Sequence, residues 1–271
     1  MRLAFGIEYN GAAFHGWQSQ PGAATVQDVL EHAIGRIAGH PVRTVCAGRT
    51  DAGVHAQIQV AHADVDAVRP SGAWVRGVNS FLPADVAVRW AVAVPADFHA
   101  RYSAFSRTYR YILSNSPVRP ALDAGRVGWF HHPLDAEVMV AAASVLVGTH
   151  DFSAFRSAEC QAKSPVKTLL DAAVVRRGEC LFLNFRANAF LHHMVRNIVG
   201  ALVWIGSGKR DPDWMRELLA SRDRTQGAPT FAAAGLYLAG VGYDPKWHLP
   251  ECGRIIANSP PESVLTWRAP G

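Results

Sequence analysis

The chain has 271 residues, of which 49% are hydrophobic and 18% are charged. Such a composition is typical of a globular protein with room for one large domain or two small ones. No apolar run reaches the length of a membrane span, and the N-terminal residues lack the layout of a signal peptide. We therefore expect a cytoplasmic protein with no membrane partner.

The formal net charge is +5, and arginine supplies nearly all of the positive charge. A basic balance fits a polyanionic partner, nucleic acid above all. Because an arginine bias also follows from genome composition, the charge by itself leaves both interpretations open.

The spacing of cysteine and histidine argues against a metal site. The cysteines lie far apart and form no C-x-x-C pair, and a chain of this length needs no disulfide framework. His131–His132 and His192–His193 are adjacent pairs, whose side chains are expected to diverge on a strand or a helix. We expect no metal and no other cofactor.

The first part of the chain alternates strands and helices. Apolar periodicity predicts helices at 25–40 and 71–83, and strands at 3–9, 43–47, 54–62 and 85–95. Thr25 lies three residues before Asp28, much as in a capping box, and Gly39 ends the first helix.

The second part repeats this pattern. Helices are predicted at 133–148, 191–206 and 211–222, and strands at 102–115, at 235–243 and on both sides of a turn within 171–188. The last helix is expected to begin with Asp211 as its N-cap and Pro212 in its first position.

Strands and helices thus alternate irregularly, without the regular rhythm of a parallel sheet. This favours an α+β fold of two similar halves with mostly antiparallel sheets flanked by helices. We expect one half at 1–98, a second at 99–248, and a loosely held tail rich in proline and serine at 249–271.

The stretch AGRTDAGVHA, residues 47–56, places Asp51 in a glycine-flanked turn between two predicted strands. The aspartate could bond its own backbone in the turn, pair with Arg49, or serve as a catalytic carboxylate kept ionised by a nearby cation. In the following strand, period two predicts two faces: Val54, Ala56, Ile58 and Val60 on one, and His55, Gln57 and Gln59 on the other.

Two further features could contact a nucleic acid. In the predicted strand at 102–115, Arg107, Tyr109 and Tyr111 share a face, where tyrosine can stack on a base and arginine can meet a phosphate. An ordinary strand with aromatic core residues is the alternative. Arg196 lies off the apolar stripe of the helix at 191–206, where an arginine is usually a solvated surface residue.

The chain resembles the tRNA pseudouridine synthases of the A type. The resemblance covers about residues 3–248 and rests on seven motifs in the family's order. These are YNGAAFHGWQSQP, TVQDVLE, GRTDAGVHA, FHARYSAFSRTYRYIL, GTHDFSAF, ANAFLHHMVRNIVG and GLYL. Asn10, Ile58 and the pair Ala232–Ala233 depart from the family pattern, and none of them coincides with the site residues named below.

The resemblance implies a function and a site. Asp51 would be the catalytic aspartate, Tyr109 would stack on the target uracil, and Arg196 would pair with the carboxylate. Arg49 belongs to the same motif as Asp51, and Leu236 would line the pocket. It also implies a homodimer without metal or organic cofactor, acting on tRNA uridines at positions 38, 39 and 40 in the anticodon arm.

The implied chemistry explains why the motif holds a single acid. Isomerisation of uridine breaks the N-glycosidic bond, turns the uracil and rejoins it through C5 without adding water, so the second carboxylate of a hydrolase is not needed. Asp51 could attack C1′ of the sugar or remove its 2′ proton, and the sequence leaves both routes open. A non-catalytic RNA-binding protein and an enzyme for small nucleosides are the alternatives.

Overall fold

In the computed structural model, residues 1–250 are described, and their strands form one 10-stranded mixed sheet. Its order is β4-β1-β3-β10-β5-β9-β8-β7, with β2 paired to β3 and β6 paired to β5. The strands are β1 Arg2–Tyr9, β2 Val45–Cys46, β3 His55–Asp64, β4 Val86–Val94, β5 Ala104–Ser114, β6 Gly128–Trp129, β7 Gly148–Asp151, β8 Val166–Arg177, β9 Cys180–Ala187 and β10 Leu236–Tyr243.

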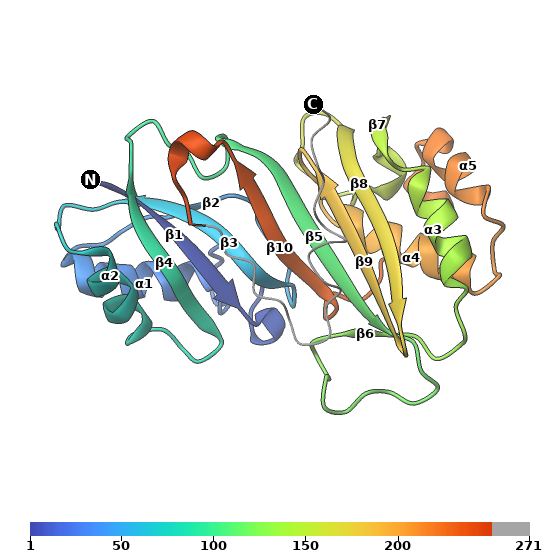
Figure 1. Cartoon of the computed structure of the whole chain (residues 1–271), viewed down its shortest axis with the longest axis horizontal. Coiled ribbons are helices and arrows are strands. Elements are labelled where there is room, and N and C mark those ends of the chain that lie inside the picture. Colours follow the sequence, from blue (N-terminus) through green and yellow to red (C-terminus); the bar gives the residue numbers. More distant parts are fainter. Residues whose placement is uncertain (251–271) are drawn as a thin grey trace.

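All five α-helices of the described chain pack on the same face of this sheet, because a single buried cluster contains apolar residues from each of them. Figure 1 shows α1 (Val26–Ala38) and α2 (Ser71–Asn79) near β1 and β4 at one end of the sheet. At the other end, α3 (Ala136–Ser144), α4 (Met194–Gly206) and α5 (Trp214–Ser221) lie near β8 and β9. The α+β fold with mostly antiparallel pairing is confirmed.

The strand β10 joins the two ends of the sheet. It pairs in parallel with β3, Tyr237 opposite His55, and antiparallel with β5, Leu236 opposite Tyr111. Because one sheet runs through the described chain, the division into halves at 98 and 99 stays a prediction. The tail at 249–271 lies almost wholly outside the described residues.

Most predicted elements are confirmed, including the cap of α1. The Thr25 hydroxyl oxygen accepts a hydrogen bond from the Asp28 amide, and Gly39 ends the helix with φ 82°. The three helices of the second part are shorter than predicted. α3 ends at Ser144, where tight turns follow and Gly148 opens β7.

The predicted start of the last helix is wrong. Asp211 accepts a hydrogen bond from the Asp213 amide, and this closes a turn that contains Pro212. The helix α5 begins only at Trp214, after Asp213. The cap-like residues therefore stabilise the turn that leads into the helix.

The predicted faces of β3 are also wrong in part. The pairing of β3 with β1 shifts by one residue between Gln59 and Ala56, which marks a β-bulge. An extra residue exchanges the faces of all side chains beyond it. Ala56 accordingly packs in the cluster under the helices, whereas Ile58 and Val60 pack in a second cluster with Trp90.

Both faces of β3 are covered, so its polar side chains are buried as well. His55 and Gln59 are 1% and 0% exposed.

Within residues 1–250, no helix is both long and apolar enough to cross a bilayer. Cys46, Cys160 and Cys180 are free thiols, and Cys252 lies outside the described residues.

His62, near the end of β3, gives the fold a pH dependence. Its Nδ1 accepts a hydrogen bond from the Ala100 amide. Burial, Arg2 and His99 lower its pKa to about 4, against a smaller opposing effect of Asp64. The unfolded chain binds a proton here from about pH 6.5 downward, and the folded chain does so only near 4, so stability falls as the pH drops through this window.

We therefore expect a His62→Asn variant to lose less stability than the parent protein between pH 7 and pH 5. The asparagine carbonyl can still accept from Ala100 but binds no proton. Urea unfolding at several pH values measures the difference. An equal loss of unfolding free energy in both proteins would contradict the assignment.

Candidate active site

Asp51 lies in the loop between β2 and β3, and this loop is held by backbone hydrogen bonds to a second loop at 14–17. The Trp17 amide donates to the Thr50 carbonyl over 3.0 Å, and the Gly53 amide donates to the Phe14 carbonyl over 3.2 Å. Gly16, with φ +88°, makes the close approach possible, because a Cβ there would lie 2.6 Å from the Thr50 carbonyl oxygen.

One buried and one half-buried side chain fix the start of the same loop. The Gln59 amide donates to the Gly48 carbonyl over 2.6 Å, and the Arg107 guanidinium donates to the Ala47 carbonyl over 2.9 Å. Arg107 also donates to the carbonyls of Arg101, Ala104 and Asn188. The guanidinium that could have met a phosphate is thus occupied by backbone carbonyls.

Three side chains from the first turn of α4 and the two residues before it contact the Asp51 carboxylate. Arg196 Nη1 lies 3.3 Å from Oδ2, His193 Nε2 lies 3.4 Å from Oδ2, and His192 Nε2 lies 3.3 Å from Oδ1. The Asp51 side chain is 22% exposed. The carboxylate is therefore accessible from solvent and faces a guanidinium and two imidazoles.

The two histidines converge because of an unusual backbone. His193 adopts φ 62° and ψ 1° just before the helix, a left-handed conformation that costs a non-glycine residue roughly 1–2 kcal/mol. The two rings lie 4.0 Å apart. The prediction that adjacent histidine side chains diverge is wrong here, because this pair precedes the helix and does not lie within it.

The other histidine pair also fails to diverge. The rings of His131 and His132 lie 3.9 Å apart. Among the described residues, however, the one group of three histidine, cysteine or acidic side chains able to hold a metal ion is Asp51, His192 and His193. The reasoning from adjacent spacing against a metal site therefore does not hold at Asp51.

The possible pairing of Asp51 with Arg49 is not found. Arg49 is exposed, and within residues 1–250 the ion-pair partners of the Asp51 carboxylate are His192, His193 and Arg196. Arg196 also donates from Nε to the Phe231 carbonyl over 2.8 Å. The arginine that faces the carboxylate is distant in the sequence, and it is not a solvated surface residue.

Burial shifts the pKa values of two groups in the site. It raises the pKa of the Tyr109 hydroxyl, and the Asp51 carboxylate raises it further. Burial lowers the pKa of His193, with Asp51 opposing this effect and His192 and Arg196 adding to it. The environment thus favours the uncharged form of both side chains.

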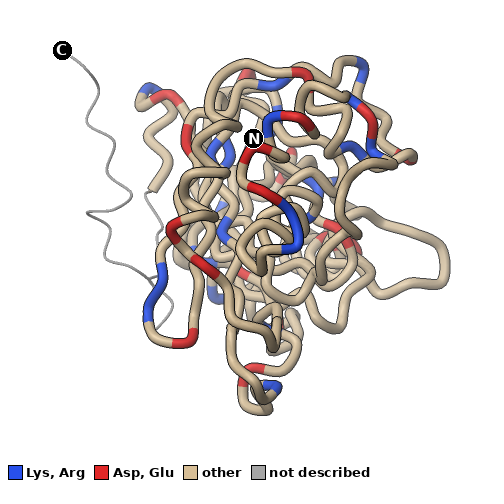
Figure 2. Tube along the Cα trace, turned by 90° about the vertical axis from the view of Figure 1, so that its right-hand side faces the viewer, with Lys and Arg blue, Asp and Glu red and all other residues tan. Residues whose placement is uncertain are grey.

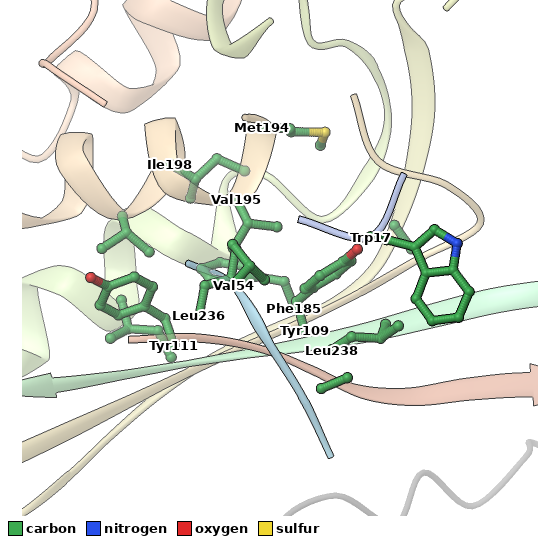
Figure 3. Packing of buried hydrophobic residues seen from close by; sticks show 14 of the residues in the cluster. Trp17, Val54, Tyr109, Tyr111, Phe185, Met194, Val195, Ile198, Leu236 and Leu238 are labelled. Atoms are coloured by element: carbon green, nitrogen blue, oxygen red, sulfur yellow. The ribbon is translucent and has the colours of Figure 1, made fainter. Parts of the chain in front are cut away.

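Tyr109 and Leu236 belong to the buried apolar cluster that packs against α4. Tyr109 is 8% exposed and packs edge-on against Phe190, with ring centres 5.0 Å apart. Leu236 is 5% exposed and opens β10. Figure 3 shows both side chains in the buried cluster to which α4 contributes Met194, Val195 and Ile198.

His55 is a buried polar residue that the sequence reasoning did not single out. Its Nδ1 accepts from the Gly11 amide over 2.9 Å, its Nε2 lies 2.9 Å from the Ala234 carbonyl, and its ring stacks on Tyr237. Burial lowers its pKa. The neutral imidazole thus ties the loop before α1 to the segment leading into β10.

The sequence was compared with models of known protein families. A sequence model described as tRNA pseudouridine synthase matches residues 7–103 and 142–244. The chain belongs to the tRNA pseudouridine synthase family. The matched ranges contain Asp51, the strand β10 that neighbours Tyr109, and the start of α4.

Proteins with similar sequences carry names from the same family. The chain is 62% identical to the tRNA pseudouridine synthase A of Aromatoleum aromaticum over 256 residues, which cover 94% of this chain and 97% of that protein. It is 60% identical to the tRNA pseudouridine synthase A of Thiobacillus denitrificans over 251 residues, covering 93% and 96%. The protein of the same name from Dechloromonas aromatica gives the same identity and coverage.

The close packing at Gly16 makes a testable prediction. Gly16→Ala should lower the free energy of unfolding by more than about 2 kcal/mol, because it adds left-handed strain and a clash with the Thr50 carbonyl. Gly22→Ala is the matched control, since Gly22 has φ +74° and a Cβ there would meet nothing within 4 Å, so strain alone should cost about 1 kcal/mol. Equal losses in urea unfolding would contradict the packing argument.

Proposed function

We propose that this chain isomerises uridine to pseudouridine in tRNA, at three consecutive positions on the 3′ side of the anticodon arm. The observation that carries the proposal is the solvent-accessible Asp51 carboxylate, 3.3 Å from Arg196, within the family motif GRTDAGVHA. The family membership and the names of the similar proteins support a tRNA substrate.

In the proposed reaction, Asp51 acts on the ribose of the target uridine. The carboxylate either attacks C1′ or removes the 2′ proton, and the C1′–N1 bond breaks with its electron pair leaving on the uracil. The uracil then turns and C5 bonds to C1′. In the first route this breaks the bond between Asp51 and C1′ and frees the carboxylate, and in the second route Asp51 returns the proton to C2′. Finally the proton on C5 is lost and N1 gains a proton. The atoms of the nucleotide balance without water, so one carboxylate is sufficient.

The surrounding groups have distinct proposed roles. Arg196 fixes the direction of the Asp51 carboxylate, which its 3.3 Å contact supports. Tyr109, whose pKa is raised by burial, stacks on the uracil as it turns. Leu236 lines the apolar side of the pocket. Arg49 is exposed beside the carboxylate loop, where it can meet an RNA phosphate.

The partners and the location are also proposals. The net charge of +5 favours a polyanionic substrate. Figure 2 shows basic and acidic residues interspersed on the side of the molecule that it presents, with no continuous basic stripe there. We expect the RNA to lie over the solvent-accessible Asp51 carboxylate, because the target uridine must reach it. We further propose a homodimer that works in the cytoplasm and needs no cofactor for the reaction.

The Asp51→Asn variant tests the proposed reaction. It keeps the volume of the side chain but removes the charge, so pseudouridine formation should fall below detection while tRNA binding stays within about threefold of the parent. Mass spectrometry of unmodified tRNA transcripts incubated with the protein maps the product. Asp66→Asn is the matched control, since the Asp66 side chain is 97% exposed and pairs only loosely with His40. Turnover by Asp51→Asn near the parent rate would refute the role.

The proposed homodimer has its own test. Light scattering at micromolar protein should give twice the 29.4 kDa chain mass. A monomer that is fully active at nanomolar concentration would contradict the dimer and would mean that one chain contacts the whole arm alone.

A further inference from the structure

The proposed reaction uses the Asp51 carboxylate but gives no role to the two imidazoles in contact with it, and the three side chains together form a set of ligand atoms. Asp51, His192 and His193 each offer one ligand atom, and these atoms all lie within 4.8 Å of one another. Two imidazole nitrogens and a carboxylate oxygen are the ligand types found in open, three-residue zinc sites, which leave a fourth position free.

The distances are close to those that tetrahedral coordination requires. His192 Nε2 lies 3.3 Å from Oδ1, and His193 Nε2 lies 3.4 Å from Oδ2 of the same carboxylate. In a tetrahedral zinc site with bonds of about 2.0–2.1 Å, neighbouring ligand atoms are about 3.3–3.4 Å apart. Each histidine thus lies at this distance from one of the two carboxylate oxygens, and one ligand atom from each of the three residues can be chosen so that all lie within 4.8 Å of one another.

The backbone holds the two histidines in place without a metal. The His192 carbonyl accepts from the Ser157 amide over 3.0 Å, and the His193 carbonyl accepts from the Asn197 amide over 2.9 Å. The side chains remain reachable from solvent, with 34% of His192, 26% of His193 and 22% of Asp51 exposed. An ion can enter this group without unfolding it.

Arg196 limits the affinity of such a site. Its Nη1 atom lies 3.3 Å from the same oxygen, Oδ2, that faces His193. A guanidinium this close repels a second cation. The site is therefore suited to reversible occupancy by a cation with a strong preference for nitrogen ligands, and not to a permanently bound structural metal.

We propose that Asp51, His192 and His193 form an inhibitory site for a divalent transition-metal cation, with zinc as the best-fitting member. Magnesium is excluded, because it prefers oxygen ligands in octahedral geometry and keeps its waters. An ion bound to the Asp51 oxygens blocks their access to the ribose. Inhibition of pseudouridine formation rests on the proposed function, whereas binding of the cation to Asp51, His192 and His193 does not.

Binding is tested first, on the whole protein without RNA. Cobalt(II) reports tetrahedral coordination by its visible absorption, so the parent protein, His192→Gln and His193→Gln are titrated with it. Loss of a ligand should weaken binding at least about tenfold, since loss of an outer-shell partner alone costs about 10–100-fold. The double variant His131→Gln/His132→Gln is the matched control, because its rings also lie close together, and it should bind as the parent does.

Two spectroscopic results would overturn the site. One is a parent protein without the visible bands of tetrahedral cobalt. The other is an intense near-ultraviolet thiolate band, which would place the ion on Cys160, whose Sγ accepts from the His192 amide over 3.4 Å. Equal weakening by the His131 and His132 substitutions would likewise assign the ion elsewhere.

Inhibition is tested next, with tRNA, constant magnesium and buffered free zinc, each variant being compared with its own zinc-free rate. The parent should lose activity with zinc and regain it on chelation, and His192→Gln should need at least about tenfold more zinc for the same fractional loss. Equal zinc sensitivity of both would overturn the inhibition. Histidine-dependent cobalt binding by a protein that forms no pseudouridine without metal would instead refute the proposed function and leave the metal site standing.

Discussion

The contact between Asp51 and the start of α4 is the interaction on which the site depends. The carboxylate is 22% exposed, and a charged hydrogen-bond donor in contact with it fixes its direction. Arg196 supplies the fixed charge at 3.3 Å, and the carboxylate lies at the N-terminal end of a helix, where the helix dipole favours an anion. The left-handed backbone at His193 carries a strain energy. The contacts that this conformation allows with Asp51 compensate for that strain.

The same contact requires the two ends of the sheet to be placed accurately. Asp51 and Arg196 are 145 residues apart in the sequence, and they come from a loop before β3 and from a helix packed beyond β5. The strand between β3 and β5 is β10. Hydrogen bonds of this strand to both neighbours fix the separation across which the arginine meets the carboxylate.

The sequence predicted those features that depend on local periodicity. Strands and helices were found because apolar residues repeat every 2 or about 3.6 positions, and the cap at Thr25 was found because it uses a residue only three positions away. Asp51, Tyr109 and Arg196 were found through family motifs, and the structure brings Asp51 and Arg196 into contact. Their roles in the reaction remain proposals.

What the sequence could not predict depends on partners that are distant along the chain. The bulge in β3 arises from its pairing with β1, so period two alone misplaced Ile58 and Val60. The convergence of His192 and His193 depends on a positive φ at a residue that is not glycine. Arg49 was the nearest cation in sequence, yet the loop geometry turns it toward solvent and leaves the carboxylate to α4.

The position of β10 has a consequence for synthesis on the ribosome. The chain emerges from its N-terminus, and domains generally fold as units during translation. The strands β3 and β5 are made early, but the strand that separates and joins them is among the last described residues, Leu236–Tyr243. Until that segment has emerged, β3 and β5 each have an unpaired strand edge. If translation ends shortly before Leu236, the released protein contains the complete Asp51 motif, but its site is not assembled.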